Sequence, residues 1–380
     1  MLISPTTAAR RPHRRMLRIA AAASVAFVAA SLLAASPLSP DAATAQAAVS
    51  VASAASAAPV GTSNASKTKG LNYVALGDSY AAGYGLLPLT GAPVPGCVQS
   101  ANNYPHQIAA ALKMNLTDGT CTSATTANIV TTPQVTAAGV APLQISALSA
   151  DTDVVSLTIG GNDVGFFDIA SACVSLTPTG PLAYDPTKPN CTAVFNAPGY
   201  DQLAAKIAYI VAPAIANTLA AIKVAAPNAK VFVVGYPSIT PDAANTPTTG
   251  AGCFTPALSA QLPFPKNSFP FSNVDVPYIH SVEVALDKAV QRETEAAGAT
   301  YVAALSGSVA NSACATANPY ISGITIESLE PFSMAFGALH PNTAGAAYLT
   351  SLVQAKVGAA YCAGTRNGDA KNKDKVGVCK

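Results

Sequence analysis

The stretch that decides the fold is Leu71-Asn72-Tyr73-Val74-Ala75-Leu76-Gly77-Asp78-Ser79-Tyr80. Its apolar run stops at Gly77 and continues through Asp78 and Ser79 into the small residues of 81–85. A short apolar run closed by a turn residue predicts a buried strand, a turn and then a helix. Ser79 would then lie at the carboxyl end of a strand, where open α/β sheets place their sites. Its N–H would lie near a helix N-terminus, which favours an oxyanion, although a serine there can also simply cap the helix.

Two further motifs carry candidate chemistry. The strand predicted for 153–159 ends at Gly160-Gly161-Asn162-Asp163, and His340-Pro341-Asn342 lies near the C-terminus. The amide of Asn162 is a donor that can hydrogen-bond the oxyanion of a tetrahedral intermediate. The alternative is an asparagine used as a turn or cap residue. We expect Asp163 to cap or orient rather than to react.

Taken in order with Gly77-Asp78-Ser79, these motifs resemble those of the SGNH (GDSL-type) hydrolases, specifically the secreted actinobacterial branch of lipases and esterases. The resemblance covers 71–362. It implies a flavodoxin-like, three-layer α/β/α sandwich with a doubly wound, mostly parallel five-stranded sheet. It also implies lipase, phospholipase or broad esterase activity without a metal or an organic cofactor. Strands predicted at 230–236 and 299–305, with helices at 200–226 and 277–297, favour the same architecture.

Ser123 marks a departure from the family pattern. Cys121-Thr122-Ser123-Ala124 occupies the place of the family's second block, where Cys-Ser-Gly-Ala is usual and the glycine N–H donates to the oxyanion. Any residue except proline carries that N–H, so the donor can survive at a position that favours the conformational freedom of glycine. The resemblance therefore implies an oxyanion hole of Ser79, Ser123 and Asn162. A loop serine without this role is the alternative for Ser123.

The general base is one of four histidines in the chain. Histidine is the usual base for a serine hydroxyl because its pKa is near neutral. His13 lies in the N-terminal segment, His106 stands beside a proline at a predicted helix start, and His280 lies in a helix with ordinary neighbours. His340 lies in the His-Pro-Asn motif, and we assign the base to it.

No carboxylate stands where a Ser-His-Asp triad would need one. Many family members have Asp three residues before the histidine, and here that residue is Gly337. In the actinobacterial branch a backbone carbonyl can accept the imidazole Nδ1–H instead. We therefore predict a Ser79–His340 dyad oriented by the Gly337 carbonyl, with Gly160 and Asp163 in supporting positions. An aspartate from elsewhere in the fold remains the alternative.

Composition sets the class of the protein. The 380 residues are 50% hydrophobic and 11% charged, which suits one sizeable α/β domain. A net charge of +2 without a Lys/Arg cluster in the body gives no indication of a nucleic-acid partner.

The eight cysteines allow 105 pairings, so spacing alone decides none of them. The family resemblance implies Cys97–Cys121, Cys173–Cys191 and Cys253–Cys314, to which we add Cys362–Cys379. We expect no metal site.

The N-terminal segment predicts export. Residues 1–47 combine an arginine-rich start, an apolar run at 19–35 and the small residues Ala45-Gln46-Ala47, which is typical of a signal peptide. A membrane anchor is the alternative for this run. We expect a flexible mature N-terminus at 48–70, the hydrolase domain at 71–362 and a disulfide-pinned tail at 363–380. Export to an oxidising compartment is consistent with paired cysteines.

These observations predict a secreted, monomeric serine ester hydrolase that acts on lipid or other acyl esters and contacts a lipid surface. One alternative is a carbohydrate esterase that removes acetyl groups, which would have a shallow, polar pocket. Another is a binding module on the same fold.

Two groups of apolar residues have two interpretations each. Phe166 and Phe167 are either core residues or acyl-binding residues. Aromatic and apolar residues of the 240–276 loop form either a rim over the cleft or their own packing: Phe254, Leu262, Phe264, Phe269 and Phe271.

Overall fold

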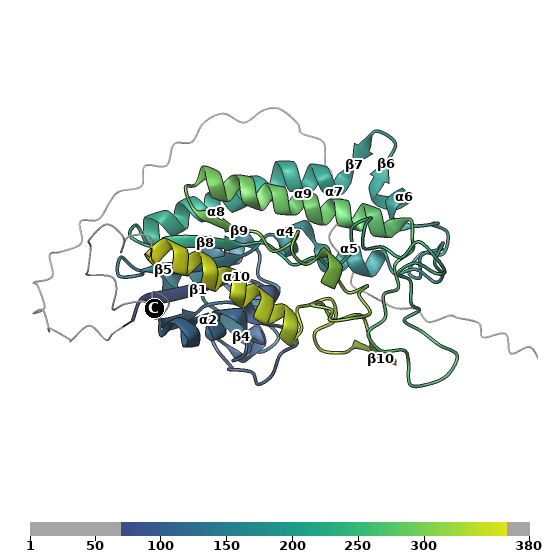
Figure 1. Ribbon diagram of the computed structural model, residues 1–380, viewed down its shortest axis with the longest axis horizontal. Helices are drawn as coiled ribbons and strands as arrows, with labels where there is room; N and C mark the ends of the chain where they lie inside the picture. The colour runs from purple at the N-terminus through teal and green to yellow at the C-terminus, as the bar shows by residue number, and fades with distance from the viewer. Residues whose placement is uncertain (1–69, 363–380) are drawn as a thin grey trace, which may run out of the picture. The chain divides into compact units, whose positions relative to one another are not determined.

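The computed structural model describes residues 70–362, with a five-stranded parallel sheet at its centre (Figure 1). The strand order is β2–β1–β5–β8–β9, with every neighbouring pair parallel. The strands are β1 (Asn72–Gly77), β2 (Asn115–Asp118), β5 (Val154–Thr158), β8 (Lys230–Val234) and β9 (Thr300–Val302). The chain runs from β1 outward to β2 and then crosses to β5 on the other side of β1. The sheet therefore changes winding direction between β1 and β5, and a site is expected at the carboxyl ends of these two strands.

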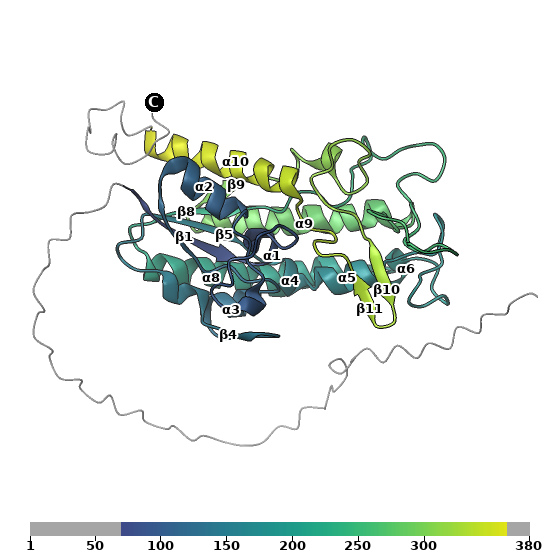
Figure 2. The ribbon, with the colours of Figure 1, turned by 90° about the horizontal axis from the view of Figure 1, so that it is seen from below.

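Helices cover both faces of the sheet, which confirms the predicted three layers (Figures 1 and 2). One face is covered by α2 (Tyr104–Leu112) and α10 (Thr343–Cys362), the other by α8 (Ala212–Ala225) and α9 (Asp275–Ala296). Alternate residues of β1 enter opposite cores, so Tyr73 packs on the α2 side and Val74 on the α8 side. Both faces of β1 are buried, which explains its nearly continuous apolar run.

The helix before β8 is interrupted near Pro213. It runs through α7 (Gln202–Lys206), a π-helical turn (Ile207–Val211) and α8. Pro213 lies in the first turn of α8, and its missing N–H removes an ordinary helical hydrogen bond at the π-helical turn. By length and composition this helix could cross a membrane. However, Val211, Ile215 and Ile222 are buried in the core, as in a core helix.

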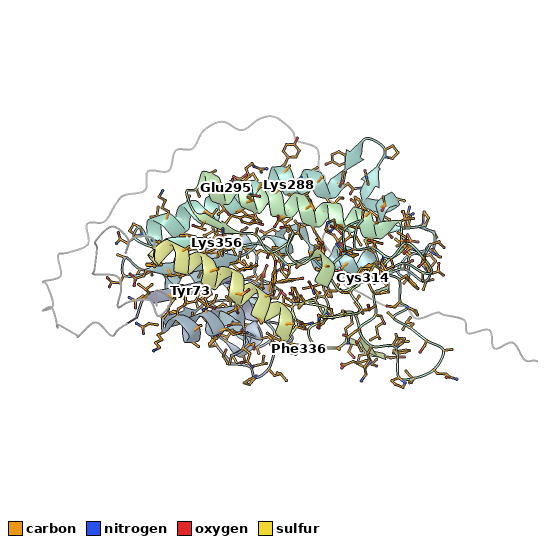
Figure 3. The ribbon with its side chains drawn as sticks, in the orientation of Figure 1. Tyr73, Lys288, Glu295, Cys314, Phe336 and Lys356 are labelled. Atoms are coloured by element: carbon orange, nitrogen blue, oxygen red, sulfur yellow. A yellow bond between two sulfur atoms is a disulfide. The ribbon has the colours of Figure 1, made fainter. Side chains whose placement is uncertain are left out.

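Helix α9 shows the amphipathic pattern of a covering helix. Leu286 and Val290 are buried, whereas Lys288 and Glu295 are exposed on its outer side (Figure 3). Helix α10 begins at Thr343 because Asn342 caps it by accepting hydrogen bonds from the N–H groups of the second and third helical residues. Pro341 therefore precedes the helix.

Shorter elements connect these layers. They are α1 (Ser79–Ala82), η1 (Pro95–Cys97), α3 (Thr126–Val130), β3 (Gln134–Thr136), β4 (Gly139–Ala141), η2 (Gln144–Ala147), α4 (Gly161–Val164), α5 (Phe166–Ala172), α6 (Cys191–Phe195), β6 (Asn196–Ala197), β7 (Tyr200–Asp201), η4 (Val309–Asn311), β10 (Ile326–Leu329) and β11 (Phe332–Met334). Most lie in the connections that follow the carboxyl ends of the strands, where they build the surroundings of the site.

The three disulfides implied by the resemblance are confirmed: Cys97–Cys121, Cys173–Cys191 and Cys253–Cys314. The fourth predicted pair, Cys362–Cys379, lies outside the described side chains, as do the predicted signal peptide, the 48–70 segment apart from residue 70, and the tail. Of the two alternatives for the 240–276 loop, the rim over the cleft is wrong, because Phe254, Phe269 and Phe271 are buried and Leu262 does not line the cavity. The second alternative agrees with the packing of Phe269 on Phe271.

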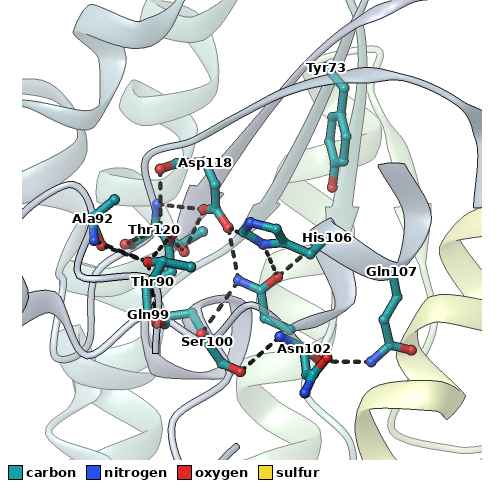
Figure 4. A network of polar contacts seen from close by, with 12 residues as sticks. Tyr73, Thr90, Ala92, Gln99, Ser100, Asn102, His106, Gln107, Asp118 and Thr120 are labelled. Carbon is teal, nitrogen blue, oxygen red and sulfur yellow. Dashed lines mark hydrogen bonds and ion pairs between the residues drawn. The ribbon is translucent and has the colours of Figure 1, made fainter. Parts of the chain in front are cut away.

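A polar network braces β2 against α2 (Figure 4). Asn103 caps α2, and its amide Nδ2 donates to Asp118 at the end of β2 (2.8 Å). His106 belongs to this network, with Nδ1 3.3 Å from Asp118. Gln99 donates to the Asp118 and Thr120 carbonyls (3.1 and 3.2 Å). The network holds the segment that follows Cys97 in place.

Candidate active site

The turn that carries Ser79 is fixed by glycine and by backbone hydrogen bonds. We call residues 77–80 the nucleophile turn. Gly77 has φ +142°, and a Cβ there would lie 2.5 Å from the Thr158 carbonyl oxygen, so only glycine fits. Asp78 donates its N–H to Thr158 (3.0 Å), and its side chain caps α1 by accepting from the Tyr80 N–H (3.0 Å). The turn therefore locks the end of β1 to the end of β5, with Ser79 at the start of α1.

His340 lies in hydrogen-bond contact with Ser79. Its Nε2 is 2.8 Å from Ser79 Oγ, and its Nδ1 is 2.8 Å from the Ala338 carbonyl oxygen. A carbonyl only accepts, so Nδ1 carries the proton and Nε2 is free to accept from the serine hydroxyl. The prediction of Gly337 as the acceptor is wrong by one residue, because the Gly337 carbonyl instead accepts the backbone N–H of His340 (3.0 Å).

Two tyrosines enclose the imidazole of His340. The ring centroids of Tyr80 and Tyr84 lie 5.0 and 4.8 Å from it. The Tyr80 hydroxyl donates to the Leu339 carbonyl (2.7 Å), which ties α1 to the residue before the histidine. Burial lowers the pKa of His340 to about 4, so the ring is neutral at pH 7. A neutral, oriented imidazole is the state that a general base requires.

A close backbone contact places the loop that carries His340. We call residues 335–341 the histidine loop. Gly337 has φ +93° and Gly85 has φ +103°, and a Cβ on Gly337 would lie 2.8 Å from the Gly85 Cα. Only two glycines permit this approach. Beside them, the ring of Phe336 packs on Tyr84 with 4.6 Å between centroids, near the N-terminal end of α10 (Figure 3). The histidine loop is thereby held against the segment that follows the nucleophile turn.

Asn162 lies in α4, directly after β5. Its Nδ2 donates to the Ala124 carbonyl (2.9 Å), and its second N–H remains for another acceptor. Gly160, with φ +115°, turns the chain from β5 into α4. Asp163 accepts from the N–H and hydroxyl of Thr126, so it positions 121–126 beside Asn162. Its predicted orienting role agrees with these contacts.

Ser123 adopts the glycine-like conformation that its place in the motif implies. Its φ is +67°, in the left-handed region, and the residue is exposed. Within the described part of the chain its N–H makes no hydrogen bond, and the residue is not among those that line the cavity. Donation from Ser123 to an oxyanion therefore stays a prediction.

A buried network beneath the nucleophile turn was not predicted. The Tyr236 hydroxyl accepts from the Gly161 N–H (2.9 Å) and donates to the second carboxylate oxygen of Asp78. Burial raises the pKa of Asp78 to about 7, although the hydrogen bond from Tyr236 opposes that rise. Tyr236 follows β8 as Ser79 follows β1 and Asn162 follows β5. Its position at the end of a predicted strand was the sequence signal for a site residue. The strand predicted at 230–236 included Tyr236, but we assigned this residue no role.

A cavity that is partly open to solvent is lined at one end by Ser79 and His340. Most of the side chains that continue it are apolar: Phe166, Phe167, Ala170, Ile239, Leu286 and Leu305. Phe167 is 57% exposed, so it is not a core residue. A cavity lined mainly by apolar side chains, with a few polar groups at one end, is typical of a site for an apolar ligand. Phe166 also packs partly against the core, and acyl binding by these two residues stays a prediction.

The other described histidines lie apart from Ser79. His106 belongs to the network of Figure 4. His280 does not have the ordinary neighbours that we predicted, because its Nδ1 lies 3.3 Å from Glu283, which raises the pKa of His280. Glu283 is buried and accepts from the N–H groups of Ile239 (3.2 Å) and Thr240 (3.1 Å). This pair holds the loop after β8, which forms one wall of the cavity.

Comparisons with known proteins agree with this geometry. Residues 75–348 match the GDSL-like Lipase/Acylhydrolase family. Lipase 2 of Streptomyces coelicolor is 37% identical over 239 residues, which are 63% of this chain and 71% of the relative. Among solved structures, phospholipase A1 from Streptomyces albidoflavus has a TM-score of 0.55 at 21% identity, covering 76% of this chain and 99% of that one. An extracellular lipase from Streptomyces rimosus has a TM-score of 0.50 at 22% identity, with the same coverage.

The fold and the family match define a carboxylic-ester hydrolase of the α/β SGNH class. The chain belongs to the GDSL-like lipase/acylhydrolase family.

Proposed function

We propose that the chain is an exported lipase or esterase that works through an acyl-enzyme on Ser79. Ser79 Oγ attacks the ester carbonyl while its proton passes to His340 Nε2. The imidazolium then protonates the leaving alcohol as the tetrahedral intermediate collapses to the acyl-enzyme. Water then attacks the acyl-enzyme and gives a proton to His340, which passes a proton to Ser79 Oγ as the carboxylic acid leaves.

One observation carries the proposal. The Ser79 hydroxyl and the His340 Nε2 lie 2.8 Å apart, and the Ala338 carbonyl holds the opposite ring nitrogen in the required tautomer. The Ser79 N–H and the free N–H of Asn162 are the donors that we assign to the oxyanion, with the Ser123 N–H as a third. Each of these groups belongs to this chain, so every proton transfer has a named donor and acceptor.

The apolar cavity supports an acyl chain as its occupant. It begins at the dyad and continues past Phe166 and Leu286, so the carbonyl carbon of an ester would lie at Ser79 with its chain against these side chains. The relative from Streptomyces coelicolor is named a lipase. We infer lipid or other acyl esters as the substrates. We further infer export through the 1–47 segment, which the three disulfides support.

Hydrolysis of p-nitrophenyl esters from acetate to palmitate, by the oxidised protein, tests the proposal. We expect activity that persists to long chains and is lost in Ser79→Ala and His340→Ala. His106→Ala is the matched control, because it removes a histidine that contacts Asp118 rather than Ser79, and it should keep its activity.

The outcomes separate the candidate functions. Serine-dependent activity confined to acetate would contradict the acyl-chain assignment and favour an acetyl esterase. Loss of similar size in the His106 and His340 variants would refute the dyad. Retention of full activity in Ser79→Ala would refute the acyl-enzyme.

A further inference from the structure

The nucleophile and one oxyanion donor lie on separate elements that need a common anchor. Ser79 begins α1 after β1, and Asn162 lies in α4 after β5. Donors that act on one oxyanion must hold their separation closely, since a misplacement of about 1 Å can cost about 10²-fold in rate. Both elements are single turns of four residues, too short to be rigid without outside support.

Tyr236 makes hydrogen bonds to both elements at once. Its hydroxyl accepts from the Gly161 N–H, the first N–H of α4 and the neighbour of Asn162. The same hydroxyl donates to Asp78, the cap of α1 and the neighbour of Ser79. Its ring packs edge-on against Tyr80, with 5.0 Å between centroids. The residue lies at the end of β8, next to β5 in the sheet, so it joins the ends of three strands.

We propose that Tyr236 is a positioning residue for ester hydrolysis: through its hydroxyl it fixes the separation between the Ser79 turn and the helix that carries the Asn162 oxyanion donor. This inference rests on the proposed function. Tyr236 has no bond to make or break in the reaction. Its effect is on the relative positions of the groups that stabilise the negative charge of the intermediate.

The network works in one protonation state of Asp78. The Tyr236 hydroxyl has one proton, which it gives to the Asp78 carboxylate, and lone pairs, one of which accepts from Gly161. If Asp78 takes up a proton, its O–H competes for the tyrosine oxygen and the tyrosine proton loses its acceptor. Around Asp78 the titratable or charged groups include Tyr80, Tyr236, Tyr104 on α2, Asp163 on α4, and Glu283 on α9 beyond Tyr80. Asp163 raises the pKa of Asp78, and Tyr236 lowers it.

The closing experiment compares Tyr236→Phe with Tyr73→Phe. Tyr73 is the matched control because it loses one buried hydrogen bond, to Ser156 (2.6 Å), on the opposite face of the same sheet. For each protein, kcat and KM with p-nitrophenyl butyrate are measured from pH 5 to 9, together with thermal unfolding. We expect kcat of Tyr236→Phe to fall about 10- to 100-fold with KM changed by less than about threefold, because the lost interaction acts on the transition state.

The pH profile separates positioning from stability alone. In the wild type, kcat should rise partially through pH 7 as Asp78 ionises. In Tyr236→Phe this rise should be lost, because the hydroxyl through which Asp78 acts on α4 is absent at every pH. Asp78→Asn provides a second variant that imitates the protonated carboxyl. Its kcat should be reduced and nearly constant across this range.

Each outcome decides the inference. Equal kcat values in the two tyrosine variants would overturn it, as would a pH profile in Tyr236→Phe that matches the wild type. If the wild type shows no hydrolysis that depends on Ser79, the proposed function fails and this inference fails with it. A wild type that hydrolyses the ester through Ser79 while Tyr236→Phe retains full kcat refutes the positioning role alone.

Discussion

Replacement of Gly337 by alanine tests how the histidine loop is held. A Cβ at this position would lie 2.8 Å from the Gly85 Cα, whereas ordinary contact begins at 3.4 Å, so the two backbones must separate by about 0.6 Å (3.4 minus 2.8). Gly337 also has φ +93°, which costs an alanine about 1–2 kcal/mol. His340 is three residues further along. A displacement of this size would stretch the 2.8 Å contact between Ser79 and His340 to about 3.4 Å, close to the limit of a hydrogen bond.

We therefore expect Gly337→Ala to lower kcat about 10- to 100-fold and to destabilise the fold by at least about 1 kcal/mol. Had Gly337 supplied only a carbonyl in an ordinary conformation, the same change would have been mild. The assay is kcat with p-nitrophenyl butyrate, measured beside thermal unfolding. Activity is compared well below the unfolding temperature of each variant, so that lost folding is not counted as lost catalysis.

Gly298 offers a matched control for the backbone conformation. It also has a positive φ, +70°, and follows α9, but an added Cβ would meet nothing within 4 Å. Gly298→Ala should therefore lose about 1–2 kcal/mol of unfolding free energy and keep its kcat. If Gly337→Ala also keeps the kcat of the wild type, the contact between Gly85 and Gly337 does not place His340, and the reasoning is refuted.

Two further predictions concern protonation and the oxyanion side. Only the neutral imidazole accepts the Ser79 proton, and burial lowers the pKa of His340 to about 4. On acidification kcat/KM should therefore be lost completely near pH 4, below the partial change assigned to Asp78. A profile in which kcat/KM falls to zero near the ordinary histidine pKa of about 6.5 would contradict this. Ser123→Gly should keep kcat within about threefold of the wild type and unfold at no lower temperature, because glycine adopts φ +67° without strain and keeps the N–H. A loss of kcat of about tenfold would instead assign a role to the serine hydroxyl.

The sequence predicted the parts of the fold that depend on local pattern. β1, β5 and β8 are short apolar runs buried on both faces, so their composition alone indicates them. β2 (Asn115–Asp118) was missed because it is a half-buried, polar edge strand that exists through its pairing with β1. The positions of Ser79, Asn162 and His340 followed from motifs, and the structure brings Ser79 and His340 into contact.

What escaped prediction depends on contacts between distant segments. The acceptor for His340 is Ala338 rather than Gly337, a shift of one residue in a loop whose shape follows from the approach of Gly85. Likewise, Tyr236 could be placed after a strand, but its partner Asp78 lies 158 residues earlier in the chain. Local sequence pattern contains no information on either pairing.

The carbonyl that orients His340 carries a chemical consequence. A carbonyl dipole selects the tautomer as a carboxylate would, but it supplies no full charge to stabilise the imidazolium. A pKa near 4 instead of the ordinary 6.5 makes protonation of His340 about 3 kcal/mol less favourable than in water. During the reaction the imidazolium forms only together with the oxyanion, so each charge lies close to the other. We therefore expect a dyad of this kind to depend on its oxyanion donors more than a triad does, and the proposed anchoring of Ser79 and Asn162 to Tyr236 to matter for rate.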